Sequence, residues 1–146
     1  MNRSSTRSVA IIATAVAVAL ALWGLFAATG VELTLKEGGP ADEVGVVDVL
    51  IASIVGALGA WVAYNFLARR GWARWWPFIG STALAISVAG PSWLADGEAA
   101  LALISMHFAV AIVLISGFAL FGAGRAASGS RSDATRRQSP ARPGAM

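Results

Sequence analysis

The sequence contains no cysteine, a single histidine and few charged residues. Without cysteine the chain has no disulfide bond, no thiol redox chemistry and no thiolate ligand for a metal. One histidine excludes a multi-histidine metal cluster. Charged residues make up 13% of the chain and hydrophobic residues 57%, whereas about a quarter of a typical soluble domain is charged. A domain of 146 residues cannot bury that much apolar surface, so we expect its solvent to be lipid.

Four long runs of the sequence carry no charge. They contain 24, 20, 21 and 26 residues and end before Glu32, Arg69, Asp96 and Arg125. A helix needs ~20 apolar residues to cross ~30 Å of hydrocarbon. The sequence therefore predicts an all-α, polytopic membrane protein whose transmembrane domain covers residues 1–124. The four transmembrane helices are expected at about residues 9–29, 46–68, 76–94 and 99–121.

The first run allows two other interpretations. Residues 14–22 alternate alanine with valine or leucine, which taken alone is typical of a strand. The length and the alanine content favour a helix, and an isolated strand in lipid would leave its backbone unpaired. A cleaved signal peptide would use Arg3 and Arg7 as its basic end. The run is longer than the ~7–15 residues of a signal core, which favours an uncleaved helix.

Charge alternates in sign along the connections between the runs. The N-terminal segment carries +2, residues 32–48 carry −4, residues 69–74 carry +3, residues 96–98 carry −2 and residues 125–146 carry +4. Arginine-rich segments stay on the cytoplasmic side of a membrane. Both termini are therefore predicted to be cytoplasmic, in a plasma membrane. The basic residues that give the net charge of +3 are therefore interpreted as topology signals. No pattern typical of nucleic-acid binding is present.

The segment 69–77 places arginines and tryptophans together at the predicted inner boundary. Tryptophan prefers this boundary because its ring is apolar and its N–H needs a polar partner. The segment is expected to anchor the chain at the interface, and anionic lipid headgroups are the alternative ligand. The predicted lipid-interface residues are Arg69, Arg70, Trp72, Arg74, Trp75 and Trp76.

Two segments that contain glycine and proline, and the polar C-terminal segment, interrupt or follow the predicted helices. Gly38-Gly39-Pro40 interrupts the outer loop and prevents a long helix there. Gly90-Pro91 is expected to fray or kink the outer end of the third helix, and Trp93 marks its outer boundary. Residues 125–146 are rich in Ser, Ala, Arg, Gly and Pro, which predicts a disordered, basic cytoplasmic tail.

Each predicted helix carries a face of small residues. Helices in lipid associate through such faces, so we expect an antiparallel four-helix bundle packed through Gly56, Gly59, Gly90 and Pro91. A homo-oligomer or a larger membrane-protein partner could use the same faces instead. The second face contains Asp48, Ala52, Gly56, Gly59 and Ala63. The third contains Gly80, Ala83, Ser87 and Gly90 or Pro91, and the fourth contains Ala100, His107, Ala111 and Leu114.

His107 is the one titratable residue inside a predicted transmembrane helix. Ionisable residues in the membrane are costly, which suggests a function, although a histidine can also serve only as a hydrogen-bond donor between helices. Asp48 shares its face with the glycines of the second helix. An Asp48–His107 pair would form a ligand-binding or proton-sensitive site, but their expected depths differ by ~9 Å, so contact would need a water molecule or an earlier helix start.

A catalytic interpretation has weaker support. Ser105 lies ~200° around the helix from His107, and Ser116 lies more than two turns deeper. No catalytic residue, no cofactor and no metal site is therefore predicted.

The distinctive positions of the chain are Gly90-Pro91 and, inside the fourth run, Met106-His107 followed by the apolar stretch to Ile115. Together they resemble the actinobacterial four-helix membrane proteins grouped as domain of unknown function 6069. The resemblance implies four transmembrane helices and a bacterial plasma membrane. It implies no known activity and so no catalytic residue.

The composition and the faces favour a non-enzymatic accessory or interaction subunit of the plasma membrane. The alternative is a small oligomeric transporter or proton-sensitive membrane protein that uses His107.

Overall fold

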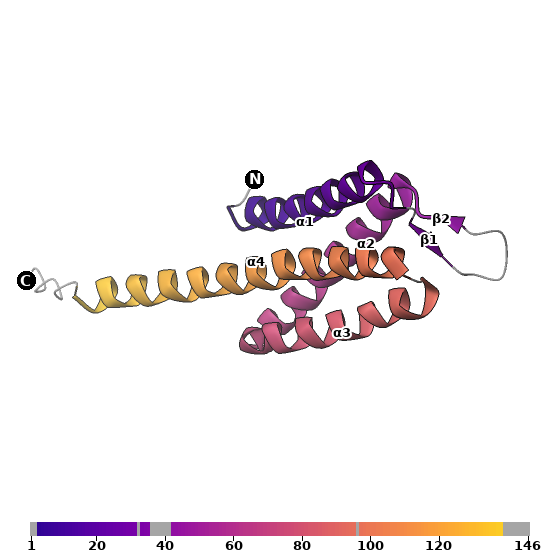
Figure 1. The fold of residues 1–146 in the computed structure, drawn as a ribbon. Helices are drawn as coiled ribbons and strands as arrows, with labels where there is room; N and C mark the ends of the chain where they lie inside the picture. Colours follow the sequence, from indigo (N-terminus) through magenta and orange to yellow (C-terminus); the bar gives the residue numbers. More distant parts are fainter. Residues whose placement is uncertain (1–2, 32, 36–41, 96, 139–146) are drawn as a thin grey trace, which may run out of the picture.

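The computed structural model describes residues 3–31, 33–35, 42–95 and 97–138, and these residues form four α-helices. Two short strands and one 3-10 turn connect them. α4 lies between α1 and α3, and α2 runs obliquely behind α4 (Figure 1). The elements are α1 (Arg3–Ala28), β1 (Thr34–Leu35), β2 (Asp42–Glu43), α2 (Val46–Arg69), η1 (Ala73–Trp75), α3 (Trp76–Leu94) and α4 (Gly97–Gln138).

Three helices are long and apolar enough to cross a membrane, over Ser5–Ala28, Val46–Arg69 and Gly97–Gly122. Between 11% and 28% of each stretch is buried inside the chain. Most of their apolar surface is therefore exposed, as expected when lipid is the solvent, and the chain is a membrane protein by this criterion. α3 has only 19 residues, and its Gly, Ser, Thr and Pro content lowers its hydropathy.

The first run is helical over 26 residues, so the strand interpretation of residues 14–22 is wrong. Alanine is the best helix former, and the alternation of alanine with larger residues does not change that preference. The helix ends in a left-handed residue, Gly30, with φ of 80°. The Gly30 N–H donates to Ala27 and the Val31 N–H to Phe26, which satisfies carbonyls that the last turn would otherwise leave unpaired.

A small hairpin connects α1 and α2. β1 and β2 are antiparallel, with Thr34 opposite Glu43 and Leu35 opposite Asp42. The sequence does not predict this pairing, because two-residue strands leave no periodic signal. The predicted break at residues 38–40 lies outside the described residues. We call this side of the molecule the hairpin end.

α2 and α3 are connected at the opposite side, the arginine end, which carries Arg69, Arg70 and Arg74. α2 closes in the same way as α1, since Gly71 has φ of 74° and the Trp72 N–H donates to the Leu67 carbonyl at 2.8 Å. η1 follows and leads into α3, whose first turn contains Pro77. Proline is tolerated there because the first N–H groups of a helix have no partner inside the helix.

The Gly90-Pro91 step does not end α3. The helix contains Pro91 and continues to Leu94, and the Ala95 N–H donates to the Pro91 carbonyl at 3.1 Å. Pro91 lies in the last turn, where the loss of one backbone hydrogen bond disturbs little of the helix.

The arginine end is packed through aromatic rings. Tyr64 of α2 stacks on Phe118 of α4 at 5.1 Å and meets Trp76 of α3 edge-on at 5.5 Å. The Trp76 indole N–H also donates to the Ile115 carbonyl of α4 at 3.2 Å. Three helices therefore meet at one buried aromatic cluster.

The hairpin end is packed by smaller side chains. Leu33, Ala99 and Leu103 belong to one buried cluster, which Trp23 of α1 flanks. The Trp23 indole N–H donates to the Val44 carbonyl at 3.1 Å, which ties α1 to the segment that enters α2. A middle cluster joins α1, α2 and α4 through Ala19, Val49 and Met106.

Three glycines permit close approach between helices. An added Cβ would lie 2.9 Å from Ile11 at Gly117, 2.8 Å from Ile115 at Gly80 and 2.6 Å from the Tyr64 hydroxyl at Gly122. These positions bring α4 against α1, α3 and α2. Close packing through small residues therefore does occur, as expected in lipid, but mostly at glycines other than the predicted ones.

α4 continues well past the predicted transmembrane segment. The sequence predicts disorder from residue 125, whereas the helix runs on to Gln138 and projects from the bundle (Figure 1). Alanine and arginine are good helix formers. Extension of an existing helix is also far easier than nucleation of a new one, which explains the difference. Residues 139–146 lie outside the described part.

Candidate functional site

One cleft gathers the small-residue faces of α2, α3 and α4. Its volume is about 890 Å³, and we call it the α2–α3 cleft. One wall contains Asp48, Ala52, Gly56, Gly59 and Ala63 of α2. The other contains Gly80, Ala83, Ser87, Gly90 and Pro91 of α3, and the floor contains His107, Ala111 and Leu114 of α4.

The course of α2 explains why the cleft is open. Near the arginine end α2 is held against α3 and α4 by Tyr64. Toward the hairpin end it instead lies against α1 and α4, where Val49 joins Ala19 in the middle cluster. Small residues on the facing walls do not fill the resulting gap. The predicted antiparallel contact between α2 and α3 is therefore confined to their arginine ends.

The predicted packing residues lie in this cleft. An added Cβ at Gly56, Gly59 or Gly90 would meet nothing within 4 Å outside its own helix, and Pro91 also lines the cleft. The structure therefore brings none of the three glycines against another helix of the chain. Gly80, which belongs to the predicted third face, does approach α4 closely.

His107 lies on the floor of the cleft and is half-buried. Its Nδ1 lies 2.8 Å from the Leu103 carbonyl. A carbonyl only accepts hydrogen bonds, so Nδ1 is the donor in this contact. No hydrogen bond to Nε2 is formed in the described part of the chain. The ring is thus held by its own helix, and its Nε2 is left for an occupant of the cleft.

Asp48 lies at the hairpin end of the same cleft, where its side chain is exposed. Its Oδ2 accepts the Gly45 N–H at 2.9 Å, at the start of α2. A carboxylate in the first turn is also favourable for the helix dipole. No hydrogen bond joins Asp48 and His107 among the described residues. The two predicted partners share a cleft but do not form the predicted pair.

The hydroxyl groups considered for catalysis are engaged locally. Ser105 donates to the Leu101 carbonyl at 2.7 Å and Ser116 to the Ile112 carbonyl. Neither residue lines the cleft. The structure therefore places no serine considered for catalysis beside His107.

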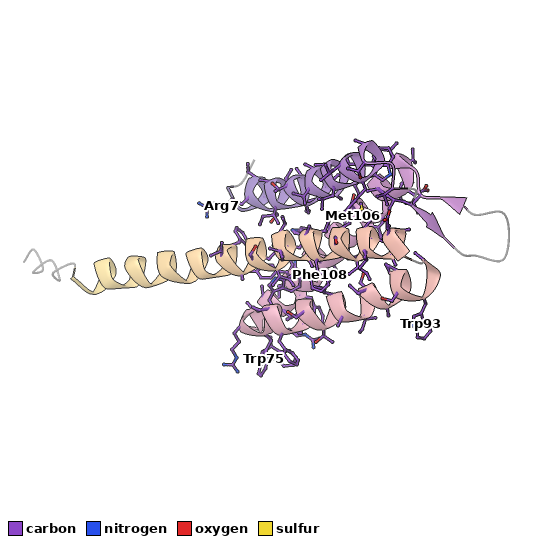
Figure 2. All side chains as sticks on the ribbon, in the orientation of Figure 1. Arg7, Trp75, Trp93, Met106 and Phe108 are labelled. Carbon is purple, nitrogen blue, oxygen red and sulfur yellow. The ribbon has the colours of Figure 1, made fainter. Side chains whose placement is uncertain are left out.

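Of the six predicted interface residues, five are exposed and one, Trp76, is buried. The Arg70 guanidinium lies 4.3 Å from the Phe66 ring centre, and that of Arg74 lies 5.8 Å from Trp75. Trp72 and Trp75 are exposed. Trp75 and Trp93 mark opposite ends of α3 and both point away from the other helices (Figure 2).

Trp76, which the sequence predicts at the lipid interface, is buried inside the chain. Only 3% of its surface is exposed, because its ring packs on Tyr64 and Phe118. Its role at the closed end of the cleft was missed, as was that of Tyr64. One signal was available, since Tyr64 lies on the same α2 face as the buried Ala57.

The comparisons with known proteins identify a family and no activity. No curated protein and no solved structure matches the chain. A family model described as a family of unknown function (DUF6069) matches residues 1–123, which include all the residues of the cleft. Because that match covers most of the 146 residues, the chain belongs to the family of unknown function DUF6069.

Proposed function

We propose that the protein is a non-enzymatic accessory subunit of a bacterial plasma membrane, and that its α2–α3 cleft receives a transmembrane helix of a larger membrane protein. The observation that carries the proposal is the cleft itself. Its walls consist of small residues that no helix of the chain approaches at Gly56, Gly59 or Gly90. Such faces permit close contact between backbones, which is how helices associate in lipid.

The proposal includes α3 as a fourth transmembrane helix. Its 19 residues span ~28 Å at ~1.5 Å per residue, close to the ~30 Å of a hydrocarbon core. Exposed tryptophans stand at both of its ends, as in the interfacial belts of membrane proteins. If α3 also crosses, the basic segment after residue 125 lies on the same side as the arginine-rich segments at residues 3–7 and 69–74, as the charge pattern favours.

The shape of the cleft favours a helix as the occupant. Its α2 wall runs from Asp48 to Ala63, which is ~22 Å along the helix axis. An occupant of that length in a membrane must satisfy its own backbone hydrogen bonds, which a helix does. The occupant also meets few charges, since Asp48 lies at the mouth and His107 on the floor.

The absence of cysteine makes a direct test practical. A thiol-reactive photo-crosslinker would be attached to Ala52→Cys or Ala83→Cys, which lie on the two walls of the cleft, and activated in native membranes. We expect both variants to link to the same larger membrane protein. Ile51→Cys and Ile86→Cys are matched controls, because both side chains are exposed on the same helices and neither lines the cleft.

Two results would contradict the accessory role. One is a product with the mass of two 15.0 kDa chains, which identifies a second copy as the occupant. The other is a cleft variant that gives no product beyond those of the controls. A partner that is linked from both walls and lost when Gly56→Trp fills the cleft supports the proposal.

A second candidate function rests on His107. Its Nε2 has no hydrogen bond in the described part of the chain, in a cleft that also contains Asp48. This arrangement supports a proton-sensitive membrane protein or a small oligomeric transporter. Flux into proteoliposomes would test it: a pH-dependent flux that His107→Ala abolishes supports transport, and no flux above that of empty liposomes contradicts it.

A further inference from the structure

A second groove, separate from the α2–α3 cleft, lies at the arginine end. α1 and α2 form its walls, Phe121 and Gly122 of α4 also line it, and its volume is about 750 Å³. We infer that this groove binds one anionic phospholipid, with the phosphate beside Arg69 and an acyl chain between α1 and α2. This inference does not depend on the proposed function, because it concerns other residues and the other side of α2.

Polar groups gather at one end of the groove. Ser5 and Ser8 of α1 line it together with Asn65 and Arg69 of α2. The Asn65 amide donates one N–H to the Trp61 carbonyl at 2.7 Å and keeps a second N–H. This N–H, the Ser5 hydroxyl and the Arg69 guanidinium are donors that suit phosphate oxygens, and a guanidinium can bind phosphate through two parallel hydrogen bonds. This end lies at the same level as the last turn of α2, beside the arginines of the α2–α3 connection.

Arg69 differs from its two neighbouring arginines. Arg70 lies over the ring of Phe66, and Arg74 lies near that of Trp75. Arg69 forms no ring contact or ion pair in the described part of the chain, and neither Arg70 nor Arg74 lines the groove. Arg69 is therefore the arginine of the connection whose charge is directed to the groove.

Charge complementarity favours an anionic occupant. Residues 1–31 and 49–95 contain five arginines and no aspartate or glutamate. These two ranges include all of α1 and the whole α2 wall of the groove. The one carboxylate of α1 and α2, Asp48, lies 21 residues before Arg69 at the other end of α2. A negative charge beside Arg69 therefore has to come from outside these two helices.

The rest of the groove is apolar and open to the membrane. Val9 of α1 and Leu58 of α2 line it, and 59% and 46% of their surfaces are exposed. Leu58 lies eleven residues before Arg69, or ~16 Å along the helix axis. A polar end joined to an apolar length of this size fits a phosphate that carries an acyl chain better than it fits a free phosphate ion.

Lipid binding to the full-length chain in detergent would test the inference by native mass spectrometry. The probes are phosphatidylglycerol and phosphatidylcholine with the same acyl chains. We expect one retained phosphatidylglycerol that phosphatidylcholine does not displace. Arg69→Gln should weaken this binding about fivefold or more, which corresponds to one lost basic contact near a membrane surface.

Arg74→Gln is the matched control, because it removes the same charge from the same connection outside the groove. We expect it to weaken binding less than about twofold. Leu58→Trp leaves every charge in place and fills the apolar part of the groove, so it should also weaken retention. Because Leu58 is half-exposed, this change should leave the helix packing intact, which thermal unfolding of the variant would verify.

Three outcomes would overturn the inference. Equal retention of the two lipids excludes a headgroup-specific site. Equal effects of Arg69→Gln and Arg74→Gln reduce the site to general attraction by the basic end. Displacement of the lipid by inorganic phosphate at similar concentration identifies a site for the free anion and not for a lipid.

Discussion

The α2–α3 pair is closed at one end and open along the rest of its length. At the arginine end, the rings of Tyr64 and Trp76 meet at 5.5 Å and both pack on Phe118. Toward the hairpin end the same two helices face each other across a cleft of about 890 Å³. The difference shows that large rings hold these helices together, whereas their small residues leave space.

The glycines show the same contrast. Gly80 and Gly117 allow isoleucine side chains of neighbouring helices to come close, whereas Gly56 and Gly59 face open space. The residue type is the same in both groups. A glycine permits a close contact, but the contact forms only where another element brings the second helix there. Four predictions test this contrast, from the largest expected effect to the smallest.

Tyr64→Ala should have the largest effect. It removes a buried ring that contacts α3 and α4, so we expect a loss of about 3 kcal/mol in the free energy of unfolding. Spin labels at Ala63→Cys and Ile79→Cys, on the two cleft walls, should report a wider separation. Tyr64→Phe keeps the ring and should cost less than about 1.5 kcal/mol. An unchanged separation in Tyr64→Ala would show that the rings do not hold the closed end.

Gly117→Ala should destabilise the α1–α4 contact. The added Cβ would lie 2.9 Å from Ile11 Cγ2, so the helices must separate or the side chain must move, at about 1–3 kcal/mol. Ile11→Ala removes the obstacle, and the double variant should lose less stability than the sum of the single changes. Unfolding in detergent measures all three, and strict additivity would argue against a direct contact.

Asp48→Ala should have a smaller effect at the open end. It removes the acceptor of the Gly45 N–H at the start of α2, and loss of such a contact costs about 1 kcal/mol or less at an exposed position. Hydrogen exchange of the Gly45 amide should become faster, while Asp48→Asn, which keeps a side-chain oxygen, should preserve most of the protection. Equal exchange in the wild type and Asp48→Ala would contradict a capping role.

Gly56→Ala and Gly59→Ala should have the smallest effect, with the opposite sign to Gly117→Ala. A methyl group at either position meets nothing within 4 Å, and alanine stabilises a helix interior by about 0.5–1 kcal/mol relative to glycine. The isolated chain should therefore unfold at the same temperature or slightly higher. A clear loss of stability would mean that another surface covers these glycines in the purified protein.

Much of the fold was predictable because it depends on residues close together in the chain. The long runs without charge predict helices at residues 9–29 and 46–68. The structure has them at Arg3–Ala28 and Val46–Arg69, so three of the four ends agree to within one residue. Residues 14–22 are helical despite their strand-like alternation, because length and alanine content favour a helix. Residues 125–138 continue α4 where the sequence predicts disorder, because extension of a formed helix is easier than nucleation of a new one.

Less of the candidate site was predictable. The small faces of α2 and α3, together with His107 and Asp48, do meet in one place. The sequence predicts that the small faces of α2 and α3 pack on one another, whereas in the structure they are separated by the α2–α3 cleft. The groove at the arginine end was not predicted, because Ser5 and Ser8 are 60 or more positions from Arg69 and no pattern along the chain joins them.

Sequence alone therefore determined the apolar composition and the helices, and the glycines at positions 30 and 71 suit the positive φ that ends α1 and α2. These properties follow from local backbone preferences and from transfer of each segment between water and lipid. Only the tertiary structure decided that Trp76 is buried, that Gly117 is packed and that Gly56 is free. Those outcomes depend on the oblique course of α2, which results from contacts between residues far apart in the sequence.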